Sequence, residues 1–275
     1  MKDHGHDPVS AIAEADATGA VAEIFADIRT TMEIPMLTSI WRTLVAVEDG
    51  LASGWAATKP LHLTSQPAAA LARIVDRAAL PVPEPLVPGQ LACAGVPSSQ
   101  VPAARAIIDA YNRSNGMNMV ALTALIAAPS GKPPDGPVAP PPAPWPALRP
   151  LLAQADIDED TWALLHQINR FGAAADDGGL ATLWRHLAHW PGLLALIHAG
   201  LAPLQHDGTV ERAIGEVHDL SQSEGARLAQ LRTEPVVLPE PARRMIADYV
   251  AKPDRVARMV TLGHGLAQWL AVAPD

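Results

Sequence analysis

The stretch Ile40–Leu61, IWRTLVAVEDGLASGWAATKPL, returns in altered form as Leu183–Leu204, LWRHLAHWPGLLALIHAGLAPL. The two stretches lie 143 residues apart and agree at 8 of 22 positions. The identical pairs are Trp41/Trp184, Arg42/Arg185, Leu44/Leu187, Leu51/Leu194, Ala52/Ala195, Ala56/Ala199, Pro60/Pro203 and Leu61/Leu204. Solenoid repeats have periods of roughly 20–50 residues. A spacing this long predicts instead two tandem copies of one helical unit.

A second similarity, at a spacing of 138 residues, links PAARAIIDAYN, from Pro102, with PEPARRMIADYV, from Pro239. The matching pairs are Ala104/Ala242, Arg105/Arg243, Ile108/Ile246, Tyr111/Tyr249 and Thr123/Thr261. Together the two similarities predict a first helical repeat over residues 1–128 and a second over residues 151–275. We expect the two repeats to pack against each other as a pseudo-dimer within one chain.

Residues 129–150 are rich in proline and separate the two predicted repeats. Of the 27 prolines in the chain, ten fall between Pro129 and Pro150. Such a stretch favours extended polyproline geometry and cannot form a helix. We interpret it as a linker, with a binding site for a proline-recognition domain as the alternative. A second proline cluster, from Pro81 to Pro102, interrupts the first repeat.

Outside the proline clusters, apolar residues recur at helical spacing. Val21, Ile24, Phe25 and Ile28 share one face of a predicted helix. The pattern predicts a long helix from Leu37 to Leu51. In the second half it predicts helices over 162–171, 180–196, 210–231 and 242–270. Strand signals are almost absent, so the predicted fold class is all-α.

Composition excludes several classes of function. The chain has 275 residues, 49% apolar and 18% charged, with a net charge of -9. An acidic surface argues against a nucleic-acid partner, since phosphate binding needs basic residues. The single Cys93 fits a reducing compartment. No signal-peptide pattern and no apolar run of about 18 residues is present, so we expect no membrane span and a cytoplasmic protein. Whether two chains form a homodimer stays open.

No general catalytic motif is present, such as a phosphate-binding loop, HExxH, CxxC or nucleophile elbow. His186 and His189 have the i, i+3 spacing of metal ligands on a helix, but zinc needs at least a third ligand. A metal or haem site is therefore an alternative interpretation. Arg42 and Arg185 could grip a carboxylate across a shared cleft, or form intramolecular caps and ion pairs, which is the simpler reading.

The segment YNRSNGMNMVALTAL, Tyr111 to Leu125, places three asparagines and a glycine within an apolar helix. Asparagine disfavours helix interiors because its side chain competes for backbone hydrogen bonds. These residues either cap a new helix or hold a polar group in an apolar interior.

Three segments resemble the group I DL-2-haloacid dehalogenases, in the same order along the chain. They are EIFADIRTTMEIPMLTSIWRTLV from Glu23, the asparagine segment, and HLAHWPGLLALIHAGLAPL from His186. The resemblance implies an all-helical pseudo-dimer with an active site between two repeats. It also implies hydrolysis without a cofactor, in which water attacks C2 of a short 2-haloacid and displaces halide with inversion.

The resemblance also assigns candidate site residues. Asn115 matches the family's asparagine that holds the attacking water, and Tyr249 matches a pocket tyrosine. Met36 and Ser39 match pocket-wall positions. The family's Ser–Asp pair falls on Thr182 and Leu183, so the carboxylate that would activate water is missing.

Two substitutes for that carboxylate suggest themselves. His186 lies one turn after Leu183, and histidine suits a general base at neutral pH. Asp176 or Asp177 could enter the site if the helix began earlier. Three hypotheses follow: a dehalogenase-like hydrolase that uses Asn115 and His186, a metal- or haem-dependent enzyme, and a non-catalytic binder of small carboxylic acids.

Overall fold

The computed structural model describes residues 11–135, 142–174 and 179–272. Over these residues the fold is all-α, as predicted, and no strand occurs. The α-helices are α1 (Gly19–Met32), α2 (Ser39–Leu44), α3 (Gly50–Leu63), α4 (Gln66–Arg77), α5 (Gln90–Cys93), α6 (Val101–Ile126), α7 (Glu159–Ile168), α8 (Thr182–His186), α9 (Pro191–His206), α10 (Thr209–Leu228), α11 (Glu240–Ala251) and α12 (Val256–Ala271). Single 3-10 turns are η1 (Glu14–Asp16), η2 (Gln154–Asp156), η3 (Leu187–His189) and η4 (Ala229–Leu231).

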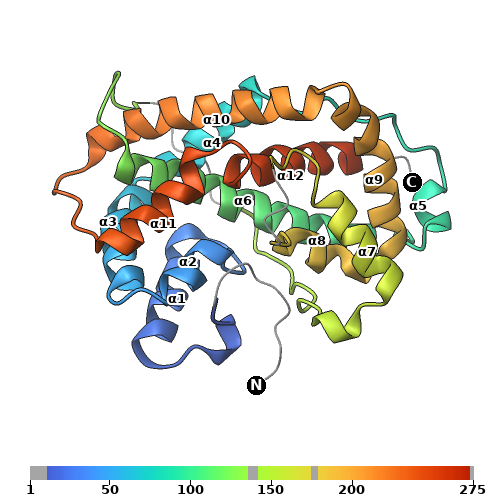
Figure 1. Ribbon diagram of the computed structural model, residues 1–275, viewed down its shortest axis with the longest axis horizontal. Helices are drawn as coiled ribbons and strands as arrows, with labels where there is room; N and C mark the ends of the chain where they lie inside the picture. The colour runs from blue at the N-terminus through green and yellow to red at the C-terminus, as the bar shows by residue number, and fades with distance from the viewer. Residues whose placement is uncertain (1–10, 136–141, 175–178, 273–275) are drawn as a thin grey trace.

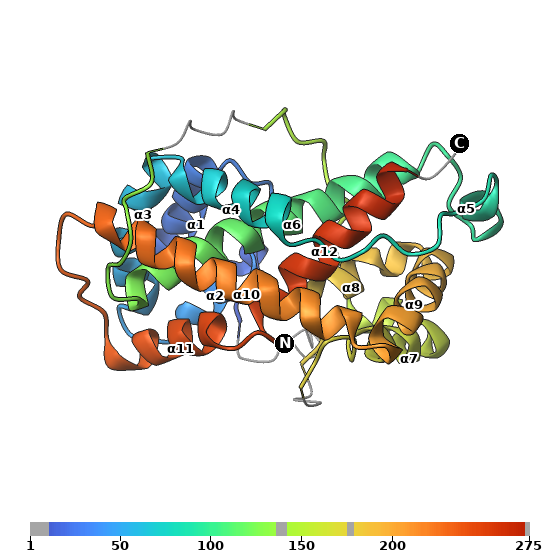
Figure 2. The same ribbon diagram turned by 90° about the horizontal axis from the view of Figure 1, so that it is seen from above.

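Helices α6 and α12 lie side by side through the middle of the molecule, and α10 runs along them (Figure 1). Helices α1, α2, α3 and α11 gather at one end, whereas α7, α8 and α9 gather at the other (Figure 2). The central helices therefore join the two ends.

Each end has its own hydrophobic core, and each core draws on both halves of the chain. The first core includes Ile28 and Trp41 from the first half and Ile246 from the second. The second core includes Ile107 from the first half and Trp184 from the second. Neither predicted repeat therefore has a core of its own, and the boundaries at 128 and 151 stay a prediction.

Three predicted long helices are wrong because the chain breaks within them. The helix expected over 37–51 divides into α2 and α3 at a turn where Asp49 has a φ of 56°. The helix expected over 180–196 divides before Pro191, which opens α9. The one expected over 242–270 divides between α11 and α12, around Pro253. Proline lacks an N–H and disfavours helical geometry in the residue before it, so it breaks two of these helices.

The central helices pack closely because glycine stands at their contacts. A Cβ on Gly225 of α10 would lie 2.3 Å from a Thr123 side-chain carbon on α6. A Cβ on Gly263 of α12 would lie 2.1 Å from Asn112 Oδ1, also on α6. Both separations are shorter than van der Waals contact, so the observed approach of these helices requires glycine.

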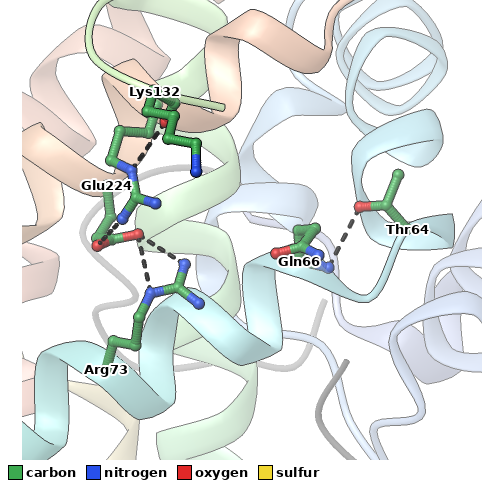
Figure 3. Close-up of polar contacts among 6 residues, drawn as sticks. Thr64, Gln66, Arg73, Lys132 and Glu224 are labelled. Atoms are coloured by element: carbon green, nitrogen blue, oxygen red, sulfur yellow. Dashed lines mark hydrogen bonds and ion pairs between the residues drawn. The ribbon is translucent and has the colours of Figure 1, made fainter. Parts of the chain in front are cut away.

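A buried carboxylate ties α4, α10 and the start of the linker together. Glu224 on α10 is 3% exposed and accepts hydrogen bonds from Arg73 at 2.7 Å and from Arg227 at 2.8 Å. Arg227 also donates to the Lys132 carbonyl at 3.0 Å (Figure 3). Two guanidinium partners compensate for the burial of this charge.

The described part of the proline-rich segment is extended, as predicted, and packs on the helices. Ser130 donates its backbone N–H to Ala226 O at 3.1 Å, and Trp145 donates Nε1–H to Glu33 O at 2.9 Å. No helix among the described residues is long and apolar enough to span a bilayer.

His62 on α3 is buried in the first core against Trp55, with the ring centroids 5.7 Å apart. Within the described chain, neither ring nitrogen has a hydrogen-bond partner. Burial, with a smaller contribution from the Arg113 charge, lowers the pKa of His62 to about 3. The ring is therefore neutral in the folded protein at neutral pH.

We predict that His62 makes the protein less stable as the pH falls from about 6.5 to about 3. In this window the unfolded chain binds a proton at His62 and the folded chain does not. The His62→Phe variant should show a weaker pH dependence of the free energy of unfolding, measured by urea denaturation. His206→Phe, at an exposed histidine, is the control. An unchanged pH dependence in His62→Phe would contradict the prediction.

Candidate functional site

A small cavity between the two ends of the molecule collects most of the predicted site residues. Its volume is about 190 Å³. The lining comes from both halves of the chain and consists of Thr38, Ser39, Tyr111, Asn115, Gly179, Leu180, Ala181, Thr182, Leu183, Tyr249, Asp254, Arg255, Val256, Arg258 and Met259. Five predicted residues are thus brought together: Ser39, Asn115, Thr182, Leu183 and Tyr249.

A chain of hydrogen bonds holds the cavity wall in place. Trp41 Nε1 donates to Asn118 Oδ1 at 3.0 Å, and Asn118 Nδ2 donates to Thr38 Oγ1 at 2.9 Å. Thr38 in turn hydrogen-bonds the Tyr249 phenol, and Tyr249 Oη donates to Asn115 Oδ1 at 3.3 Å. We call these five residues the Trp41–Asn115 relay. It links the conserved-spacing tryptophan of the repeat to an amide in the cavity.

The asparagines of α6 hold polar groups and do not begin a new helix. Helix α6 continues unbroken from Val101 to Ile126 through all three. Asn118 and Asn115 belong to the relay, whereas Asn112 Oδ1 faces Gly263 without a hydrogen-bond partner among the described residues. Because Tyr249 occupies Asn115 Oδ1, the Asn115 N–H groups are left to donate into the cavity.

Burial raises the pKa of Tyr249 well above its usual value, and the hydrogen bond from Thr38 offsets part of this effect. The phenol is therefore protonated at neutral pH and serves as a donor. Its hydrogen bond fixes the orientation of the Asn115 amide.

Residues at the two repeat spacings face each other in this cavity. Ser39 and Thr182, 143 residues apart, begin helices α2 and α8. Tyr111 and Tyr249, 138 residues apart, also both line it. The interiors of helices α3 and α9 each contain a matching proline, Pro60 and Pro203. This pairing is the arrangement expected of two repeats related by a pseudo-twofold axis through the cavity.

The chain departs from that symmetry in its charged and apolar walls. Leu183 is 1% exposed and gives the cavity an apolar surface. Asp254 and Arg255, in the turn before α12, and Arg258 on α12 add charge. Sequence reasoning missed these three residues and Thr38. The turn at Pro253 was the only local signal, whereas Tyr111 could have been found as the repeat partner of Tyr249.

Two predicted site residues lie outside the lining. Met36 packs partly buried against the second core. His186 is 5% exposed, its Nε2 hydrogen-bonds Arg149 O at 2.6 Å, and its Nδ1 lies 3.4 Å from Tyr111 Oη. Burial lowers the pKa of His186. Both ring nitrogens therefore engage protein groups, and the ring anchors the end of the linker.

The metal and arginine hypotheses find little geometric support. His189 Nε2 hydrogen-bonds Pro150 O at 2.8 Å, so, like His186 Nε2, it acts as a donor to a carbonyl. No cluster of three or more metal-ligand side chains occurs in the described parts of the chain. Arg42 and Arg185 are buried but do not line the cavity. Asp176 and Asp177 lie outside the described residues.

A larger cavity of about 850 Å³ lies near α5, between the start of α6 and residues 142–146 of the linker. It contains none of the predicted site residues. Size alone would favour it as a binding site, but the 190 Å³ cavity has the convergent polar groups that a reaction needs.

We predict that the Asn118→Val variant lowers the free energy of unfolding by about 1–3 kcal/mol, because the buried Trp41 Nε1–H loses its acceptor. Valine is the residue at the matching repeat position, Val256. The comparison is Asn115→Ala, whose amide faces the cavity and which should cost less. Urea denaturation measures both, and equal losses would contradict the prediction.

No protein-family model and no curated protein sequence matches this chain. Solved structures do match it. A D-2-haloacid dehalogenase mutant in complex with D-2-CPA superposes with a TM-score of 0.70 at 13% identity, over 100% of this chain and 98% of its own. A D-2-haloacid dehalogenase with L-LA gives 0.63 at 13% identity, over 99% and 96%. The chain therefore has the helical fold of the D-2-haloacid dehalogenases.

Proposed function

We propose that this protein is a dehalogenase-like hydrolase that uses water to attack C2 of a short 2-haloalkanoic acid or a related 2-substituted acid. The observation that carries the proposal is the Asn115 amide, oriented by Tyr249 in a cavity that both halves of the chain line. The fold shared with D-2-haloacid dehalogenases over the whole chain supports it.

The size and charge of the cavity favour a small anionic substrate. A volume of about 190 Å³ would hold roughly six water molecules, at about 30 Å³ each. This is room for a short acid and one water, not for a long acyl chain. Arg255 and Arg258 line the cavity and supply positive charge that attracts a carboxylate.

Each polar group of the cavity has a role in this proposal. Asn115 positions the attacking water or the leaving halide through its free N–H groups. The Ser39 and Thr182 hydroxyls stand at matching positions and would contact the substrate carboxylate. Leu183 packs against the substrate carbon chain. His186 has no role here, because its two nitrogens already bind Arg149 and Tyr111.

We expect the wild-type protein to release halide from both enantiomers of 2-chloropropionate. The Asn115→Ala variant should lower kcat by about 10²–10³-fold, since it removes an oriented polar group from the reacting centre. Asn112→Ala, one turn away and outside the cavity, is the control for folding.

Halide release that is equal in the wild-type protein and in Asn115→Ala would refute the proposal. A wild-type protein that is stabilised against heat by 2-chloropropionate but releases no halide would instead be a binder of small acids.

The Tyr249→Phe variant tests the orientation of the Asn115 amide. One hydrogen bond contributes about 0.5–1.5 kcal/mol, so we expect kcat to fall by about 2- to 10-fold while KM changes little. Steady-state halide release measures both constants. A loss as large as that of Asn115→Ala would show that the phenol itself takes part in the reaction.

A further inference from the structure

The proposed reaction needs a group that accepts a proton from water, and the position expected to supply it holds Leu183. Most other polar side chains of the described lining cannot do so. Guanidinium groups of Arg255 and Arg258 are always protonated, and the hydroxyls of Ser39 and Thr182 are not basic. Burial raises the pKa of Tyr249, which keeps the phenol protonated.

Asp254 is the one carboxylate among the described residues that line the cavity. Its side chain is partly buried, in the turn that joins α11 to α12. Tyr249, five residues earlier on α11, hydrogen-bonds Asn115 across the same cavity. In a cavity of about 190 Å³, a water held by Asn115 is close to every wall.

The repeat explains why this turn reaches the cavity. At the spacing of 138 residues, Pro253 and Asp254 correspond to Asn115 and Gly116 of the first half. In the first half that segment is part of the continuous helix α6, whereas in the second half the helix breaks around Pro253. The break turns the backbone at this position and replaces a glycine by a carboxylate facing the same cavity.

We infer that Asp254 is the general base of the hydrolysis, a function that the second half of the chain supplies from this turn and not from position 183. The inference rests on the proposed function. The Asp254 carboxylate takes a proton from water as the water oxygen forms a bond to C2. The C2–halogen bond breaks, halide leaves with the electron pair, and the product is a 2-hydroxy acid of inverted configuration. Asp254 then releases its proton to solvent.

The test measures halide release from 2-chloropropionate by the wild-type protein and by Asp254→Asn. We expect kcat to fall by about 10²–10⁴-fold, the usual contribution of a general base. Thermal stabilisation by 2-chloropropionate should persist, because the substrate still binds. Asp248→Asn, at an exposed carboxylate of α11, is the matched control and should behave like the wild-type protein.

Further variants separate the alternatives. Asp254→Ser provides a second substitution if Asp254→Asn does not fold, and Asp254→Glu should recover part of the activity. Asp176→Asn and Asp177→Asn should leave kcat within a few-fold of wild type. Loss of activity in either of these, with Asp254→Asn active, would overturn the inference but leave the proposed function intact. A wild-type protein without halide release would overturn both.

Discussion

The Trp41–Asn115 relay is the interaction on which the site depends. Each member donates to the next, from the indole through Asn118 and Thr38 to Tyr249 and Asn115. Hydrogen bonds aligned in this way polarise one another, and in a buried setting each unsatisfied group would be costly. The relay therefore fixes one arrangement of α2, α6 and α11, and with it the direction of the Asn115 amide. Its last member is the only one that can reach a ligand through free donors.

The relay holds because the two halves of the chain are interlocked. Helix α6 contributes Ile107 to the second core and Val120 to the first, so it cannot move relative to either end without disturbing both. Gly225 and Gly263 allow α10 and α12 to approach it closely. A cavity placed where the cores meet is consequently lined by both halves and rigid on most sides. Such preorganisation suits a reaction in which one water must be held beside one carbon.

The chemistry of the cavity departs from its symmetry in the second half. Leu183 makes one wall apolar, which strengthens electrostatic interactions within the cavity by excluding water. Asp254 and Arg255, in the turn after α11, bring charge to a position where the first half has uninterrupted helix. A duplicated fold can move a functional group to another element of the same half, provided that element faces the shared axis.

Periodicity and proline alone determined the all-α class, the extended segment after Pro129 and the grouping of Ser39, Asn115, Thr182, Leu183 and Tyr249 around one site, because helical spacing and residue matches are local properties of the chain. The tertiary structure decided what depends on distant contacts. Helix breaks at Asp49, Pro191 and Pro253 were not foreseen, since a periodic pattern continues across a turn that preserves its phase. His186 was a reasonable candidate base from its spacing, but a neighbouring linker carbonyl occupies it. Asp254 carries no motif, and only the folding of its turn onto the cavity brings a carboxylate beside Asn115.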